Sequence, residues 1–207
     1  AVRMAREIGV RHVVIETDEL REEKFRKNPP NRCYYCKKVL FEEILRFAER
    51  EDIPYVLEGS NADDTRDFRP GLRAVRELGI RSPLLEAELG KNEIRTLSKD
   101  MGIETWNKPS FACLASRFPY NTEIDRTSLE RVERAEEVLR DMEVGQFRVR
   151  YHGDVARIEV RPDDISRLAD GVVRQKIVRE FEKLGFKYTA LDLKGYRTGS
   201  MNETLDK

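Results

Sequence analysis

Apolar residues in the first half of the chain follow two alternating patterns, one typical of helices and one typical of strands. Stretches with apolar side chains on one helical face alternate with short continuous apolar runs. The predicted elements are, in order, a helix ending at Ile8, a buried strand at 12–16, a helix at 33–51, a strand at 55–58, a helix at 72–78, an extended piece at 80–85 and a helix at 91–101. Strands that alternate with helices indicate an open parallel α/β sheet.

The second half of the chain has a different order of predicted elements. A long helix at 127–142 precedes two runs of alternating residues at 147–151 and 155–160, which we expect to form a hairpin. One helix at 164–184 and a strand at 188–193 follow. This order is typical of a small α+β domain, so the sequence predicts two domains, 1–120 and 121–207.

The composition disfavours some classes of function but does not identify one. The 207 residues contain 39 Lys and Arg and 39 Asp and Glu, so the net charge does not favour nucleic acid as a partner. No apolar run reaches the about 18 residues of a membrane helix, and we expect no membrane association. Three cysteines are an odd number for a disulfide scaffold. They indicate a reducing compartment, which we take to be the cytoplasm, and a metal or catalytic role.

The cysteines offer one candidate metal site. Cys33 and Cys36 form a Cys-x-x-Cys pair at the start of a predicted helix, where the helix dipole favours thiolates, and Cys113 lies far downstream. Tetrahedral zinc needs a fourth ligand, for which only His12 and His152 are available. A [4Fe–4S] cluster on three thiolates leaves one iron open for a sulfide or a substrate. A redox-active Cys33–Cys36 pair and ordinary buried thiols are the alternatives.

Two segments of the first domain carry candidate nucleotide ligands. The loop 59–64 follows a predicted strand, and its Asn61, Asp63 and Asp64 suit a ribose, Mg²⁺ or a phosphate-bound metal. An Asx-rich turn that caps the next helix is the alternative. Lys91 begins another helix, where a cation opposes the dipole unless an anion lies between them. This indicates a phosphate contact by Lys91, with Arg95 one turn later. A solvated surface charge is the alternative, and the sequence leaves both open.

A third candidate is the hairpin of the second domain. Arg148 and Arg150 alternate with apolar residues, so both guanidinium groups should lie on one face of the strand, and Arg157 follows on the next strand. Such a cluster can bind a phosphate group through bidentate hydrogen bonds. A solvated polar strand face is the alternative.

Several motifs together resemble one known family, and they run over nearly the whole chain. They are Asn-Pro-Pro-Asn-Arg-Cys-Tyr-Tyr-Cys-Lys at 28–37, Gly-Ser-Asn-Ala-Asp-Asp at 59–64, Arg-Pro-Gly at 69–71, Lys-Pro-Ser-Phe-Ala-Cys-Leu-Ala-Ser-Arg-Phe-Pro at 108–119, Phe-Arg-Val-Arg at 147–150 and Leu-Asp-Leu-Lys-Gly-Tyr-Arg-Thr-Gly-Ser-Met-Asn at 191–202. The chain resembles the LarE family of the PP-loop superfamily, ATP-dependent sulfur transferases that mature the nickel-pincer nucleotide of lactate racemase. The resemblance implies a Rossmann-like fold of the adenine nucleotide alpha hydrolase type.

The resemblance also implies a reaction. The family adenylates a carboxylate of a pyridinium biscarboxylic acid mononucleotide with ATP and Mg²⁺, and sulfur then replaces AMP to leave a thiocarboxylate. Members with one cysteine give up the sulfur of the residue that matches Cys113. Members with all three, as here, are expected to hold a [4Fe–4S] cluster on Cys33, Cys36 and Cys113 that carries the extra sulfide. Arg148 and Arg150 match arginines that bind the substrate phosphate.

Four more residues take expected roles from the same resemblance. Ser116 and Arg117 match residues that line the substrate pocket. Glu136 and Glu159 match acidic residues associated with metal at subunit contacts, for which surface ion pairs are the alternative. Members of the family assemble as trimers paired into hexamers, so a homo-oligomer is expected.

One family motif does not occur. No Ser-Gly-Gly-x-Asp-Ser loop, which binds pyrophosphate through its backbone N–H groups, stands anywhere in the sequence. We therefore expect an N-terminally truncated chain that binds ATP poorly by itself, with an exposed sheet edge and a tendency to associate. A tRNA-thiolating PP-loop enzyme and a non-catalytic iron–sulfur or assembly subunit are the competing functions.

Overall fold

The computed structural model describes residues 1–66, 68–108 and 112–197, which form two compact units. The first contains residues 1–22 and 31–107, and the second contains residues 23–30 and those from 108 onward. By this division residues 23–30, 108 and 112–120 group with the second unit, and the predicted domains 1–120 and 121–207 stay a prediction. Motif residues 109–111 and 198–202 lie outside the described part of the chain. Each unit is considered by itself below.

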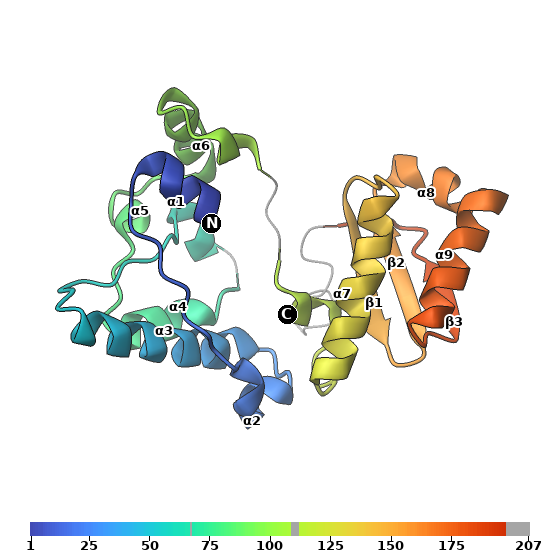
Figure 1. The fold of residues 1–207 in the computed structure, drawn as a ribbon, viewed down its shortest axis with the longest axis horizontal. Coiled ribbons are helices and arrows are strands. Elements are labelled where there is room, and N and C mark those ends of the chain that lie inside the picture. The colour runs from blue at the N-terminus through green and yellow to red at the C-terminus, as the bar shows by residue number, and fades with distance from the viewer. Residues whose placement is uncertain (67, 109–111, 198–207) are drawn as a thin grey trace. The chain divides into compact units, whose positions relative to one another are not determined.

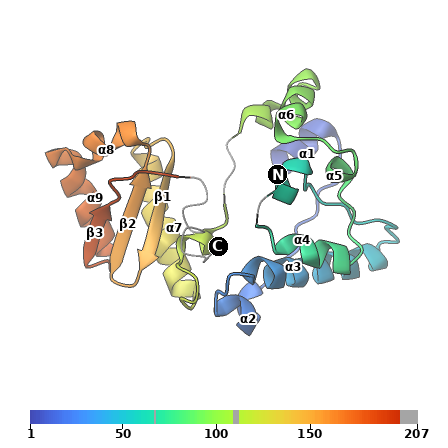
Figure 2. The same ribbon diagram turned by 180° about the vertical axis from the view of Figure 1, so that it is seen from behind.

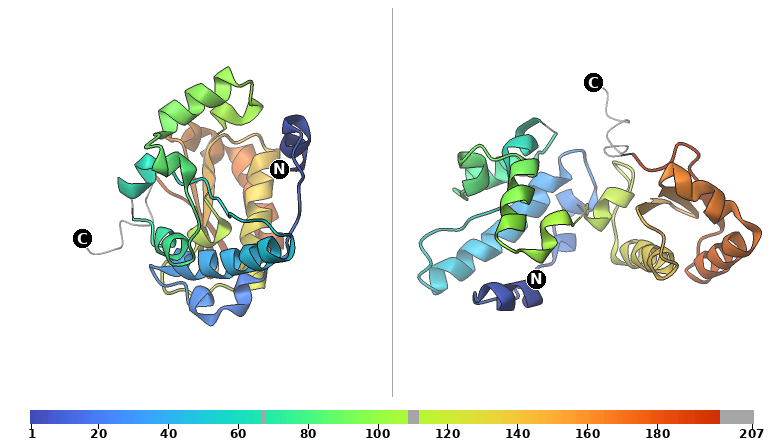
Figure 3. Two further views of the ribbon diagram at one scale, coloured as in Figure 1. Left: turned by 90° about the vertical axis from the view of Figure 1, so that its left-hand side faces the viewer. Right: turned by 90° about the horizontal axis from the view of Figure 1, so that it is seen from above.

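The first unit is mostly helical, and α1, α3, α4 and α6 stand close to where the sequence predicts them. The extended piece predicted at 80–85 is wrong from Pro83 onward, where the short helix α5 begins. Helix α4 lies alongside the longest helix, α3, and Phe41, Val75 and Ile80 form the buried core between them (Figures 1 and 3). Its elements are α1 (Val2–Ile8), η1 (Glu19–Arg21), α3 (Arg32–Arg50), η2 (Ala62–Arg66), α4 (Gly71–Glu77), α5 (Pro83–Glu86), α6 (Lys91–Asp100) and η3 (Glu104–Asn107).

The strands predicted for this unit do not form a sheet. Segment 12–16 has no regular structure, and the side chain of Val14 is 75% exposed, so the prediction of a buried strand there is wrong. Segment 55–58 makes a single parallel bridge between Leu57 and Arg81. A strand needs a neighbour for its backbone N–H and C=O groups, and within the described residues segment 12–16 has none. A mixed α/β protein is confirmed, whereas an open Rossmann-like sheet is not.

The second unit contains a three-stranded sheet in the order β1 (Phe147–His152), β2 (Val155–Val160), β3 (Tyr188–Leu191). Strands β1 and β2 form the predicted antiparallel hairpin, with Val149 opposite Ile158, and β3 is parallel to β2. Helices α7 (Arg126–Asp141) and α9 (Gly171–Lys183) cover the apolar face of the sheet, which Figure 2 shows from the other side. The remaining elements are α2 (Glu23–Arg26), η4 (Leu114–Arg117) and α8 (Pro162–Ala169).

The single helix predicted at 164–184 is wrong, because α8 and α9 are separate helices. Asp170 lies between them with an extended backbone (φ −54°, ψ 141°), and its carboxylate accepts the N–H of Val172 at 3.1 Å. Asp at an N-cap competes with continuation of the helix, and Gly171 further weakens it. In the described part of the chain, no helix has the length and apolar character needed to span a membrane.

Candidate functional site

The three cysteines are divided between the two units. Cys33 is exposed and Cys36 half-buried in the first turn of α3, whereas Cys113 is exposed and precedes η4 in the second unit. Residues three apart on a helix lie on one side, so Cys33 and Cys36 form a two-thiol face. Thiolates are the ligands that iron–sulfur clusters use, so this donor set fits one. Within the described residues, no group of three or more His, Cys, Asp and Glu side chains is placed to hold a metal ion. The three-thiolate site stays a prediction.

Close packing positions the two-thiol face. A Cβ added to Gly71 at the start of α4 would lie 3.0 Å from Cδ of Lys37 and 3.3 Å from the carbonyl oxygen of Cys33. A larger residue there would push α4 away from the first turns of α3. The hydroxyl of Tyr34 also donates to Glu77 on α4 at 2.6 Å.

A half-buried carboxylate that the sequence analysis missed, that of Glu58, holds the loop 59–64 in place. Glu58 accepts hydrogen bonds from the backbone N–H of Ser60 (3.0 Å), the hydroxyls of Ser60 (2.9 Å) and Ser82 (2.5 Å) and the ammonium of Lys37 (3.0 Å). Burial raises the pKa of Glu58, but these donors outweigh it and lower the pKa to about 2. Its carboxylate therefore joins the loop to helix α3. Only its place at the end of a predicted strand could have drawn attention to it.

The loop makes an Asx turn, as in the alternative predicted for it, but the helix that it caps is α6 and not the next helix along the chain. Asp63 accepts the backbone N–H of Lys91 at 2.7 Å, so it caps α6, and Asn61 accepts the N–H of Asp63 at 3.1 Å. Asp64 is buried and lies 3.4 Å from the ammonium of Lys91 and 3.0 Å from the guanidinium of Arg69.

The anion that Lys91 needs at the start of α6 is thus supplied within the protein by Asp63 and Asp64. Arg95, by contrast, is exposed and makes no ion pair with any described residue. Whether these groups bind a nucleotide stays a prediction.

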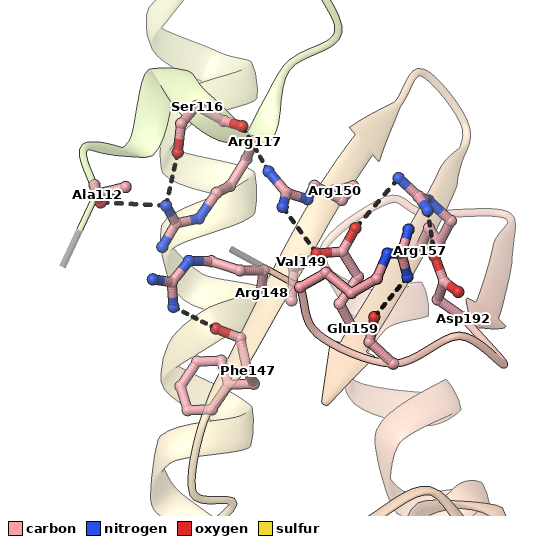
Figure 4. Close-up of polar contacts among 12 residues, drawn as sticks. Ala112, Ser116, Arg117, Phe147, Arg148, Val149, Arg150, Arg157, Glu159 and Asp192 are labelled. Atoms are coloured by element: carbon pink, nitrogen blue, oxygen red, sulfur yellow. Dashed lines mark hydrogen bonds and ion pairs between the residues drawn. The ribbon is translucent and has the colours of Figure 1, made fainter. Parts of the chain in front are cut away.

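The arginines of strand β1 are not on a solvated face. Arg148 is 5% exposed and Arg150 is 8% exposed, although both alternate with apolar residues as predicted. Arg150 donates to the carbonyl of Ser116 at 2.8 Å and to the carboxylate of Glu159 at 2.7 Å (Figure 4). Arg157 pairs with the same Glu159 at 3.3 Å and with Asp192. Burial of these groups is a tertiary effect that a strand pattern does not predict.

Arg117 and Glu136 form a second buried pair beside the first. The guanidinium of Arg117 binds Glu136 through Nε at 2.7 Å and through Nη2 at 2.9 Å. Glu136 and Glu159 are buried, not on the surface, and both contact arginines. Their expected association with metal at subunit contacts stays a prediction.

Arg148 is the one arginine of this cluster that pairs with no carboxylate among the described residues. Its guanidinium donates to the carbonyl of Phe147 at 2.6 Å and lies 5.1 Å from the ring centre of Tyr196. Burial and the positive charges of Arg117 and Arg150 lower the pKa of Arg148. A buried cation that lacks a counterion is costly, and an anionic ligand would offset that cost.

Tyr196 is a second residue that the sequence analysis missed, and the turn at Gly195 positions it. Gly195 has φ of +69°, and a Cβ there would lie 2.8 Å from the carbonyl oxygen of Val160. The N–H of Tyr196 donates to that same carbonyl at 2.7 Å. The Lys-Gly-Tyr-Arg sequence could have indicated this turn, since glycine is often found where the backbone is left-handed.

These features define a class: a mixed α/β protein with a cluster of buried arginines, two of which pair with buried carboxylates. No family model matches the chain. Pyridinium-3,5-bisthiocarboxylic acid mononucleotide synthase of Lactiplantibacillus plantarum is 37% identical over 208 residues, which cover all of this chain and 74% of that protein. An uncharacterized protein of Synechocystis is 42% identical over 207 residues, all of this chain and 77% of its own length. An uncharacterized protein of Methanocaldococcus jannaschii is 37% identical over 176 residues, 85% of this chain and 68% of its own.

The chain therefore belongs to the family of pyridinium-3,5-bisthiocarboxylic acid mononucleotide synthases, the LarE family.

Proposed function

We propose that the protein is a sulfur transferase that uses ATP to convert a carboxylate of a pyridinium mononucleotide into a thiocarboxylate. The observation that carries this proposal is Arg148, a buried arginine without a carboxylate partner among the described residues, next to the segment of Cys113. A nucleotide phosphate supplies the missing negative charge. The relationship to the Lactiplantibacillus synthase supports the choice of substrate.

The proposed reaction has two steps. A carboxylate oxygen of the substrate attacks the α-phosphorus of ATP and releases pyrophosphate, which leaves an acyl adenylate. A sulfur anion then attacks the acyl carbon, and AMP departs with the former carboxylate oxygen. Adenylation is needed because a carboxylate is a poor electrophile, and the sulfur must be anionic to be a nucleophile.

Each group of residues has a separate task in this scheme. Arg148 binds the substrate phosphate, with Arg150 and Ser116 shaping the pocket around it. Asn61, Asp63, Asp64, Lys91 and Arg95 belong to the ATP and Mg²⁺ side. Mg²⁺ would screen the charge of the phosphates during adenylation. Cys33, Cys36 and Cys113 hold the sulfur source, and a bound [4Fe–4S] cluster would supply an additional sulfide.

Binding of a pyridinium mononucleotide tests the role of Arg148. Arg148→Gln should weaken binding of nicotinic acid mononucleotide about 10- to 100-fold, the worth of a charged hydrogen-bonded contact. Titration calorimetry of the wild type and the variant measures this. Arg134→Gln, which alters an exposed arginine on α7, is the matched control and should bind as the wild type does. Equal affinity in both variants would remove the basis of the proposal.

Turnover tests the chemistry. Because the sequence has no Ser-Gly-Gly-x-Asp-Ser loop, the assay supplies a segment that carries this loop. Incubation without oxygen with that segment, ATP, the biscarboxylate mononucleotide and sulfide should release AMP and yield a thiocarboxylate visible by mass spectrometry. Cys113→Ala should form no thiocarboxylate. Absence of AMP with any carboxylate substrate would favour a non-catalytic iron–sulfur protein instead.

A further inference from the structure

Arg117 and Glu136 form a buried ion pair beside Cys113, and both residues make further contacts in addition to the pair itself. The side chain of Arg117 is 3% exposed and that of Glu136 is 7% exposed, and two parallel hydrogen bonds join them. Burying both charges carries a desolvation cost that often exceeds the attraction between them. Stability alone is therefore a weak reason for this pair, and its other contacts are informative.

Arg117 binds the backbone around the sulfur-bearing residue. Its third nitrogen, Nη1, donates to the carbonyl of Ala112 at 3.1 Å and the hydroxyl of Ser116 at 2.9 Å (Figure 4). It also donates to the carbonyl of Cys113 at 3.2 Å. All three nitrogens of the guanidinium are thus occupied within the protein. Arg117 closes the turn that Cys113 begins and is a poor candidate for direct contact with a substrate.

Glu136 extends the same connection to strand β1. Its Oε1 accepts the backbone N–H of Val149 at 3.0 Å. Because β1 is an edge strand, an N–H that points away from β2 has no strand partner, and Glu136 satisfies it. Val149 lies between Arg148 and Arg150, the proposed phosphate residues.

A second link runs in parallel. Arg150 donates from the same strand to the carbonyl of Ser116 at 2.8 Å. The Cys113 segment is therefore joined to β1 at two points, through Arg117–Glu136–Val149 and through Ser116–Arg150.

We propose that Arg117 and Glu136 are positioning residues, which hold the backbone of Cys113 at a set place relative to Arg148. The inference rests on the proposed role of Cys113 in sulfur transfer. A sulfur donor must meet the acyl carbon of a substrate whose phosphate is bound elsewhere, and a misplacement of about 1 Å can cost about 100-fold in rate. The pair would thus affect turnover without touching the substrate.

The test replaces the pair with apolar residues of similar size. Arg117→Met combined with Glu136→Leu keeps the site packed, and such replacements often preserve stability. We expect a somewhat lower unfolding temperature, because the buried N–H of Val149 loses its acceptor. We also expect about tenfold faster hydrogen exchange at the amides of 113–118, and affinity for nicotinic acid mononucleotide within about threefold of the wild type. Thiocarboxylate formation should fall about tenfold or more.

Two further variants make the result specific. Arg81→Met with Glu86→Leu removes an exposed bidentate pair in the first unit and should change none of these quantities. Arg117→Lys keeps the positive charge but loses the two parallel hydrogen bonds of the guanidinium. The exchange rates of the 113–118 amides in this variant should lie between those of the wild type and the double variant.

Exchange and binding need no turnover, so they separate this inference from the proposed function. Unchanged amide exchange in the double variant would overturn the inference, and so would a loss of mononucleotide binding as large as that of Arg148→Gln.

Discussion

At Glu58, four hydrogen bonds converge on one carboxylate and join the loop 59–64 to the helix that carries Cys33 and Cys36. Nothing about a single Glu after an apolar run predicts this, because its donors come from three separate segments. The surroundings of Arg148 are likewise not predicted by its place in the sequence. Its position on one strand face follows from alternation, whereas its burial depends on residues far away in the sequence.

Glu58→Gln should reduce stability in a pH-dependent way. The folded-state pKa of about 2 lies below the ordinary value of 4.5, so the carboxylate stabilises the folded protein above about pH 4.5, and this contribution disappears as the pH falls through about 2. At neutral pH the variant should lose about 1–3 kcal/mol of unfolding free energy, because its donors lose an anionic acceptor.

Thermal unfolding of both proteins between neutral and acidic pH measures the difference. Glu86→Gln, which changes an exposed glutamate, is the control. A gap that stays constant down to the lowest pH would contradict the assignment.

At the scale of elements, the turn after β3 places Tyr196 against Arg148. Gly195→Ala should destabilise the second unit by about 1–3 kcal/mol, because alanine resists a φ of +69° and its Cβ would press on the carbonyl of Val160. We also expect weaker mononucleotide binding, since the ring of Tyr196 would shift from Arg148. Gly153→Ala, also at positive φ but in open space, is the control for backbone strain alone. Equal effects of both variants on binding would contradict the role of Tyr196.

Element prediction succeeded where the local pattern was sufficient. Helices α3, α4, α6 and α7 and the hairpin β1–β2 stand within about two residues of their predicted bounds. Asp170 shows the limit, because one capping side chain divided a continuous amphipathic pattern into two helices. The strands at 12–16 and 55–58 show another, since an apolar run forms a strand only beside a partner.

At the scale of the whole molecule, apolar exposure and charge balance together predict association. Side chains in the first unit are strongly exposed, among them Val14 (75%), Tyr55 (66%), Leu57 (56%) and Met101 (76%). The net charge is zero, so no long-range repulsion keeps copies apart. The trimers or hexamers expected from the family would cover some of this surface.

Leu57→Lys should shift the protein toward smaller species in sedimentation velocity at neutral pH, because a charge on an exposed apolar surface disfavours its burial between copies. Leu193→Lys, a change at a still more exposed leucine of the second unit (84% exposed), should have less effect. A wild-type protein that sediments as one stable monomer would contradict this prediction.

The sequence by itself determined the helices, the hairpin, the side of β1 that carries its arginines and the residues that relate the chain to its family. These depend on local periodicity and on residue identity, both of which are legible along the chain. Only the tertiary structure decided which charges are buried and what each one contacts. Arg117, Glu136 and Val149 meet because three elements pack together. Arg148 lacks a carboxylate partner among residues 1–66, 68–108 and 112–197 only because the same packing pairs Glu136 and Glu159 with other arginines.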